Sequence, residues 1–128
     1  MKTLDASALI DFLLVPEAFD QHVSILKDNL IAPAILVPEV LNALKKAYLT
    51  KRVSRAQANQ AAKYFASFNI TLVTLSAYRH EMWELVNNLT PYDAAYVLLA
   101  RHTQTPLVTS DSRLAKASPR DIEVVLLR

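Results

Sequence analysis

The sequence predicts an α/β fold, a three-layer α/β/α sandwich around a central parallel sheet of about five strands. Hydrophobic residues make up 52% of the 128 residues and charged residues 20%, as expected when strands are buried on both faces. Short apolar segments alternate with longer segments of helical periodicity, the pattern of a parallel sheet with right-handed crossovers. The length suits one domain, and no linker or repeat interrupts it, so we expect a single domain over residues 1–128.

The first half of the chain is predicted to contain two strands and four helices. The first helix ends before Pro16, because a proline disfavours helical backbone at the residue before it. Pro38 suits the first position of a helix, where its missing N–H has no partner to lose, and Ser54 is expected to cap another. The expected elements are strand 2–5, helix 7–14, amphipathic helix 17–29, strand and turn 30–36, helix 38–48 and helix 54–68.

The second half is predicted to contain three strands and three helices. An apolar stripe at 3.6-residue spacing runs along the helix that starts at Pro91; it comprises Tyr92, Ala95, Tyr96 and Leu99. The expected elements are strand 70–75, helix 77–89, helix 91–103, strand 106–110, helix 112–117 and strand 122–127.

Composition excludes several classes of site. The chain has no cysteine, which removes thiolate zinc sites, disulfides and cysteine nucleophiles. It has no glycine, which argues against a Walker A loop or a dinucleotide-binding fingerprint, since both need glycine beside phosphate. His22, His80 and His102 are scattered, so we expect them at the surface or partly buried rather than as a ligand pair.

No segment is expected to enter a membrane. The longest apolar run, "AAYVLLA", is far shorter than the roughly 20 residues that span a bilayer. Asp5 and Asp11 interrupt the apolar N-terminal stretch, which is unlike a secretory signal. We therefore expect a soluble, cytoplasmic protein.

Four carboxylates fall at predicted strand exits or helix starts. Asp5 and Asp111 each follow a strand, Glu39 begins the helix after the second strand, and Asp93 lies in the first turn of another helix. In an open parallel sheet, sites form beyond the carboxyl ends of the strands, near the point where the strand order reverses. The four acids could therefore form one cluster at that edge.

Each acid also has a purely structural explanation. Asp93 with Thr90 resembles a capping box, and Glu39 lies where the helix dipole favours an anion. Asp111 and Asp5 could each cap the helix that follows. Capping explains each acid singly better than chemistry does.

The set as a whole favours a metal site. Two carboxylates ~4 Å apart repel by about 4 kcal/mol at an effective dielectric near 20, so several together imply raised pKa values or a bound cation. Asp5 is the hardest to explain by capping, because a strand buried on both faces ends in it. With neither cysteine nor a histidine pair, all-oxygen ligation indicates Mg²⁺ or Mn²⁺.

Four ordered motifs resemble the PIN-domain family, specifically VapC-type toxin ribonucleases of type II (VapBC) toxin–antitoxin systems. They are "LDASALID", "VPEVLNAL", "YDAAYVLLA" and "LVTSDSRLA", and together they extend over essentially the whole chain. The resemblance implies an acidic quartet around Mg²⁺ or Mn²⁺ formed by Asp5, Glu39, Asp93 and Asp111. It also implies that Ser7, Asn42 and Thr109 orient the carboxylates and metal-bound water.

The activity implied for the family is metal-dependent hydrolysis of RNA phosphodiester bonds by an endoribonuclease. A bound metal lowers the pKa of water and neutralises charge on the phosphate, and two ions ~3.5–4 Å apart would do both. Asp5 and Asp111 are the best candidates for direct ligands. Asp93 and Glu39 would bind directly or through water, and one of them could help deprotonate the nucleophile. The sequence leaves these roles open.

The charge distribution is compatible with RNA as substrate. Setting aside the four acids leaves 14 basic residues against 8 acidic ones, an excess of 6. Arg113 and Lys116 follow Asp111 closely and are candidate RNA contacts. Lys45 and Lys46 belong to a basic cluster with Lys51, Arg52 and Arg55, which could track phosphates. A solvated basic turn explains that cluster at least as well.

Partners are implied only by the resemblance: a homodimer, and a VapB-type antitoxin whose C-terminal segment fills the groove near the metal site. Tyr64, Phe65 and Phe68 could form such a surface, although core packing is the simpler explanation. The alternative function is a catalytically silent PIN-fold module that binds RNA or a partner. Phosphatase and receiver sites fit poorly, since a dehalogenase-like site needs a second aspartate where Ser7 stands.

Overall fold

The computed structural model describes residues 1–127, with all their side chains except those at positions 16, 18, 19 and 21; the last residue of the expected domain lies outside this range. Five parallel strands form one sheet in the order β3-β2-β1-β4-β5. The strands are β1 (Lys2–Leu4), β2 (Leu30–Pro33), β3 (Ile70–Val73), β4 (Leu107–Thr109) and β5 (Val124–Leu126).

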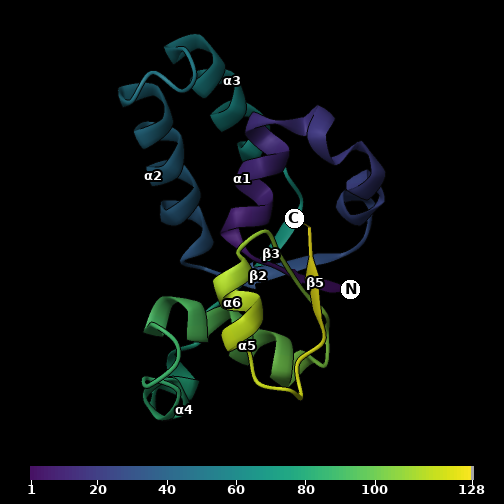
Figure 1. Cartoon of the computed structure of the whole chain (residues 1–128), viewed down its shortest axis with the longest axis vertical. Coiled ribbons are helices and arrows are strands. Elements are labelled where there is room, and N and C mark those ends of the chain that lie inside the picture. The colour runs from purple at the N-terminus through teal and green to yellow at the C-terminus, as the bar shows by residue number, and fades with distance from the viewer. Residues whose placement is uncertain (128) are drawn as a thin grey trace.

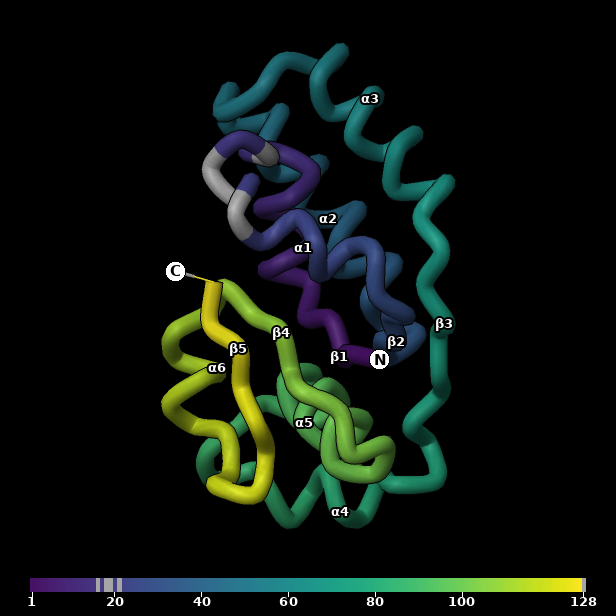
Figure 2. The backbone as a smooth tube through the Cα atoms, turned by 90° about the vertical axis from the view of Figure 1, so that its right-hand side faces the viewer, coloured from purple at the N-terminus to yellow at the C-terminus, as the bar shows by residue number. Residues whose placement is uncertain are grey.

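Helices cover both faces of this sheet and complete a three-layer α/β/α sandwich. Figure 2 shows α1, α2 and α3 on one side of the strands and α4 and α5 on the other, with α6 beside β5. The expected fold class is confirmed. The helices are α1 (Ala6–Leu14), η1 (Pro16–Lys27), α2 (Leu36–Leu49), α3 (Arg55–Ala66), η2 (Ser76–Tyr78), α4 (Arg79–Glu84), α5 (Pro91–Thr103) and α6 (Ser112–Ala117) (Figure 1).

The strand order reverses between β1 and β4. The chain runs outward from β1 through β2 to β3, returns through α5 to β4 beside β1, and then continues to β5. Thr3 pairs with Leu107 and Leu4 with Val108, and the Asp5 N–H donates to the Val108 carbonyl at 2.9 Å. The exits of β1 and β4 are therefore adjacent, at the edge where open parallel sheets form their sites.

Helix α5 supplies much of the buried core. Its residues from Ala94 to Ala100 are all buried, and the side chains of Val97 and Leu98 are fully buried. The apolar stripe predicted for this helix is wrong at one position, because Tyr92 is 59% exposed. Tyr92 lies in the first turn of α5, and the unbroken run of buried residues begins only at Ala94.

Two predicted helices differ from the observed ones. Segment 17–29 lies largely in a 3₁₀ helix rather than an α-helix, a distinction that apolar spacing cannot make, because i,i+3 neighbours share a face in both. Segment 77–89 is divided into η2, α4 and turns. There the N–H groups of Leu85 and Val86 donate three residues back, to Met82 and Trp83, which tightens the helix and ends it.

Two predicted helix starts can be compared with the structure. Helix α2 begins at Leu36, so Pro38 occupies its third position and not its first; the early N–H groups of a helix have no intrahelical partner, and proline is tolerated there. Ser54 caps α3 as expected. It does so within a full capping box, in which Ser54 and Gln57 each accept the other's backbone N–H.

No helix in residues 1–127 combines the length and apolar character needed to span a membrane.

Helix α5 ends at a residue in the left-handed region, where glycine is usual. Gln104 has φ 53° and ψ 44°, and the Thr105 N–H closes the helix by donating to the Ala100 carbonyl at 3.1 Å. Because a Cβ disfavours this conformation, we expect Gln104→Gly to raise the free energy of unfolding by about 0.5–1 kcal/mol, measured by urea denaturation. Gln104→Ala keeps a Cβ and should not stabilise; equal stabilisation by both variants would contradict the explanation.

Candidate functional site

The four predicted acids come to one edge of the sheet. Asp5 follows β1, Asp111 follows β4, Glu39 lies in the first turns of α2, and Asp93 in the first turn of α5. Asp93 is close enough to interact electrostatically with each of the other three, and Asp5 interacts with Glu39. Residues up to 106 positions apart in the chain thus contribute charge to one place.

Asp5 is a buried carboxylate that two hydroxyl groups hold in place. It is 6% exposed, and its Oδ2 accepts hydrogen bonds from Ser7 Oγ at 2.5 Å and Thr109 Oγ1 at 2.9 Å. It occupies the N-cap position of α1 but makes no side-chain cap bond, so capping does not explain it. Burial raises its pKa; these hydrogen bonds oppose that shift, and the charge of Asp93 adds to it.

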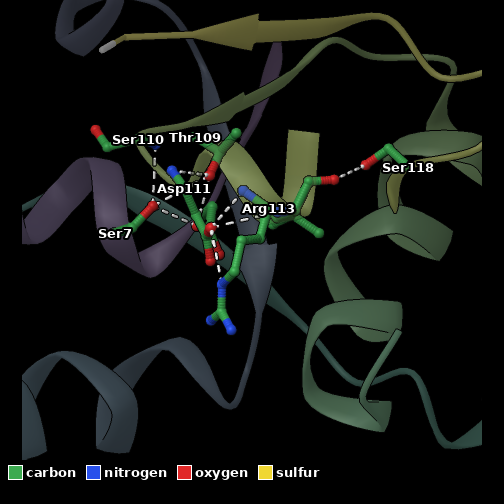
Figure 3. Close-up of polar contacts among 8 residues, drawn as sticks. Ser7, Thr109, Ser110, Asp111, Arg113 and Ser118 are labelled. Carbon is green, nitrogen blue, oxygen red and sulfur yellow. Dashed lines mark hydrogen bonds and ion pairs between the residues drawn. The ribbon is translucent and has the colours of Figure 1, made fainter. Parts of the chain in front are cut away.

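The same hydroxyl groups connect the exits of β1 and β4 (Figure 3). Ser7 Oγ lies 3.1 Å from Thr109 Oγ1 and accepts the Ser110 N–H at 3.0 Å. Thr109 Oγ1 in turn accepts the Asp111 N–H at 3.0 Å. The network therefore sets the position of the segment that carries Asp111 relative to Asp5.

Asp111 caps a helix and also faces the acid cluster. Its Oδ1 accepts the N–H groups of Arg113 at 2.9 Å and Leu114 at 3.3 Å, as expected for an N-cap. Its second oxygen takes no part in these bonds. The Arg113 guanidinium lies 3.9 Å from Oδ1, and its side chain is 92% exposed, too exposed to neutralise the carboxylate firmly.

Glu39 has a partner that the sequence alone did not reveal. The hydroxyl of Tyr96 donates to Glu39 Oε1 at 2.5 Å, and Tyr96 is 1% exposed. Sequence reasoning placed Tyr96 only in an apolar stripe; its position three residues after Asp93, on the same helix face, was the available signal. Burial raises the pKa of Glu39, the Tyr96 hydrogen bond opposes this, and the charges of Asp5 and Asp93 add to it.

Asp93 is half-buried at the start of α5. Its backbone N–H donates to Thr90 Oγ1 at 3.1 Å, which is half of the capping box expected there. Burial raises the pKa of its carboxyl, as does the charge of Asp111, while a separate hydrogen bond between the carboxyl and the Thr90 side chain and the charge of Arg113 lower it. Three of the four acids thus sit where their ionised forms are unfavourable.

The donor set fits a hard divalent cation with a mostly hydrated shell. The available donors are carboxylate and hydroxyl oxygens, and the mutual repulsion of the acids would be relieved by positive charge. Within residues 1–127, no three His, Asp or Glu side chains are grouped tightly enough to enclose an ion directly. Mg²⁺ commonly binds through one or two carboxylates and keeps its remaining waters, so such an ion does not need a tighter group of side chains.

Comparison with known proteins identifies the family. The family model described as "PIN domain" matches residues 2–118. The chain belongs to the PIN-domain family. Ribonuclease VapC1 of Mycobacterium tuberculosis is 35% identical over 98% of this chain and 96% of its own length. Ribonuclease VapC12 of the same organism is 29% identical over 99% of both chains. These relatives confirm the expected resemblance to VapC-type PIN domains.

Solved structures support the PIN fold. The crystal structure of PAE2754 from Pyrobaculum aerophilum matches with a TM-score of 0.70 and 27% identity, covering 97% of this chain and 83% of that one. VapBC2 from Rickettsia felis, solved bound to a DNA fragment from its promoter, also matches with a TM-score of 0.70, over 99% of this chain and 98% of that one. At 13% identity, the second match shows the fold alone.

The remaining predicted residues of this PIN domain lie at different distances from the acids. Ser7 and Thr109 contact Asp5, whereas Asn42 is exposed on α2 and, within the described part of the chain, its side chain makes no hydrogen bond. Lys116 is exposed on α6, as is Arg113. Lys45 and Lys46 are exposed on α2, about 10 Å along the helix from Glu39.

The basic cluster and the aromatic cluster both lie away from the acids. The basic cluster surrounds the α2–α3 turn, where the Arg55 guanidinium lies 4.7 Å from the centre of the Tyr48 ring. Of the aromatic residues on and after α3, Tyr64 is 53% exposed, while Phe65 and Phe68 pack against the core. Core packing therefore accounts for two of these three aromatic residues.

Proposed function

We propose that the protein is a Mg²⁺- or Mn²⁺-dependent endoribonuclease, the toxin of a VapBC-type toxin–antitoxin pair, acting as a single domain over residues 1–128. The observation that carries this proposal is Asp5, a buried carboxylate that Ser7 and Thr109 hold where the strand order reverses, within electrostatic reach of Glu39 and Asp93. The VapC ribonucleases that resemble this chain over nearly its full length support RNA as the substrate.

The acids would bind the metal ion, and the polar residues beside them would orient the acids and metal-bound water. Asp5 and Asp111 would hold the metal ion, with Asp93 and Glu39 ligating it directly or through water. When bound, the ion supplies positive charge to the phosphate and lowers the pKa of a water molecule. Ser7 and Thr109 hold Oδ2 of Asp5 and would thereby fix the orientation of this carboxylate toward the ion. Asn42, one turn after Glu39, would contact metal-bound water.

Glu39 and Asp93 are the candidates for a general base. Burial raises the pKa of both carboxyls, and neighbouring acids raise it further. A carboxylate with a raised pKa accepts a proton more readily than a free one. One of the two would therefore take the proton of the attacking water.

Exposed basic side chains near the site would hold the RNA backbone. Arg113 and Lys116 lie on α6, directly after Asp111, and would contact phosphates close to the cleaved bond. Lys45 and Lys46 would contact phosphates farther along the strand. Such contacts weaken as salt increases, because bound cations are released from the RNA.

The partners and the compartment that we propose are those expected for VapC-type members of the family. A homodimer and a VapB-type antitoxin are expected partners, and the cytoplasm is the expected compartment because the substrate is RNA.

Cleavage of a mixed RNA substrate tests this function directly. We expect purified, antitoxin-free protein to cut RNA in Mg²⁺ or Mn²⁺ and not in EDTA, with activity restored when metal is added back; gel analysis of the fragments measures this. Cutting that persists in EDTA would contradict the metal dependence. Binding of RNA without any cutting in metal would instead indicate the silent PIN-fold module.

A further inference from the structure

A second feature lies at the same edge of the sheet as the acids. A cavity of about 440 Å³ is formed by the turn between β2 and α2, the segment that follows β3, and the first turn of α5. We call it the base pocket, and its walls include Ile35, Thr74, Ser76, Met82, Tyr92 and Ala95. Its volume lies in the range of roughly 300–1,000 Å³ typical of sites for small organic groups.

The base pocket adjoins the acid cluster through helix α5. Tyr92 and Ala95 line the pocket, while Asp93 belongs to the acid cluster and Tyr96 donates a hydrogen bond to Glu39 in that cluster. Each pair is three residues apart, the spacing that places two side chains on one helix face. Two neighbouring faces of the same helix therefore serve the pocket and the acids.

Helix α2 also connects the base pocket with the acid cluster. Ile35 lines the pocket, and the Glu39 N–H donates to its carbonyl at 3.2 Å. Glu39 is therefore one helical turn, about 5.4 Å, beyond the pocket wall. A group in the pocket and a phosphate at the acids would be neighbours on one strand.

The lining of the base pocket suits a flat, uncharged group. None of the residues that form it carries a charge. Tyr92 is 59% exposed although it is aromatic, so its ring is available for stacking. Thr74 Oγ1 and Ser76 Oγ lie 3.1 Å apart, and because only one can donate to the other, hydrogen-bonding capacity remains for a ligand. A phosphate would find neither a cation nor a group of N–H donors among these side chains.

We infer that the base pocket receives the nucleobase next to the cleaved phosphodiester, with Tyr92 stacking on its face and Thr74 and Ser76 contacting its edge. This inference rests on the proposed ribonuclease function and adds a source of sequence preference to it. Stacking on aromatic side chains is the usual way in which proteins hold unpaired bases. Hydroxyl groups at the base edge can distinguish one base from another.

Binding of short single-stranded RNA tests the pocket. In the Asp5→Asn background, which we expect to lack cleavage, Tyr92→Ala should weaken binding roughly 5- to 100-fold, measured by fluorescence anisotropy. Tyr92→Trp should retain tight binding because it keeps a stacking surface. Trp83→Ala is the matched control, since Trp83 is 67% exposed and does not line the pocket; it should leave binding unchanged.

RNA substrates in which one base has been removed show which base Tyr92 contacts. Removing the base beside the cleavage site should weaken binding as much as Tyr92→Ala does, and the two changes together should do no more than either alone. Independent, additive losses would overturn the proposal. So would a Tyr92→Ala protein that changes from dimer to monomer in size-exclusion chromatography, which would assign the pocket to contact between copies.

The outcomes distinguish a failure of the base-pocket inference from a failure of the proposed ribonuclease function on which it rests. If the otherwise unchanged protein cuts RNA in metal, and Tyr92→Ala cuts at the same sites with the same affinity, the base pocket is wrong and the ribonuclease stands. If the unchanged protein neither binds nor cuts RNA, the ribonuclease is wrong and the pocket's assignment fails with it.

Discussion

Replacing Asp5 by asparagine is expected to reduce metal-dependent RNA cleavage by roughly 10²- to 10⁴-fold, because metal-ion catalysis is typically worth several kcal/mol of transition-state stabilisation. The asparagine keeps the shape of the side chain, and its carbonyl oxygen can still accept hydrogen bonds from Ser7 and Thr109. The negative charge is removed, and the second carboxylate oxygen becomes an NH₂ group, which cannot ligate a metal ion. Cleavage rates at saturating Mn²⁺, compared between the two proteins, measure the effect.

Thermal stability shows whether Asp5→Asn acts through charge or through folding. Burial raises the pKa of Asp5, so its ionised form opposes folding at a pH above that pKa, and we expect the metal-free variant to be no less stable than the unchanged protein. Metal should stabilise the unchanged protein by about 2.7 kcal/mol at 100 times its Kd and the variant by much less. Full cleavage activity in Asp5→Asn would contradict the role proposed for this carboxylate.

Replacing Tyr96 by phenylalanine is expected to weaken Mn²⁺ binding about 10- to 100-fold, the usual cost of losing a group that orients a metal ligand. The ring and its packing remain, and only the hydroxyl that donates to Glu39 Oε1 is removed. Without it, Glu39 can rotate away from the other acids, whose charges repel it. Isothermal titration with Mn²⁺ measures the change independently of activity.

A control tyrosine separates positioning from general stability. Tyr64 is 53% exposed on α3, and Tyr64→Phe should leave Mn²⁺ affinity unchanged. Tyr96→Phe also loses a buried hydrogen bond, and this loss should lower the free energy of unfolding by no more than about 3 kcal/mol, the upper end of the range for bonds to charged groups. Unchanged Mn²⁺ affinity in Tyr96→Phe would show that Glu39 is not positioned by Tyr96.

Helix caps show where sequence reasoning succeeded and where it needed the structure. Ser54 and Asp111 cap their helices as expected, because capping depends on groups within three residues of one another. Asp5 occupies the same kind of position in sequence but makes no cap bond. Its hydrogen bonds go to Ser7 and to Thr109, 104 residues away, and only the pairing of β1 with β4 brings Thr109 there.

The sequence by itself determined the alternation of strands and helices and the presence of four acids at strand exits or helix starts, because periodicity and capping are short-range properties of the chain. Only the tertiary structure decided that Tyr96 holds Glu39, 57 residues away, and that Tyr92 is exposed beside a cavity. Both depend on how α2 and α5, on opposite sides of the sheet (Figure 2), meet beyond its edge. Tyr92 and Tyr96 lie on one predicted apolar stripe, and little more than one helical turn is enough to place one against an acid and the other at the surface.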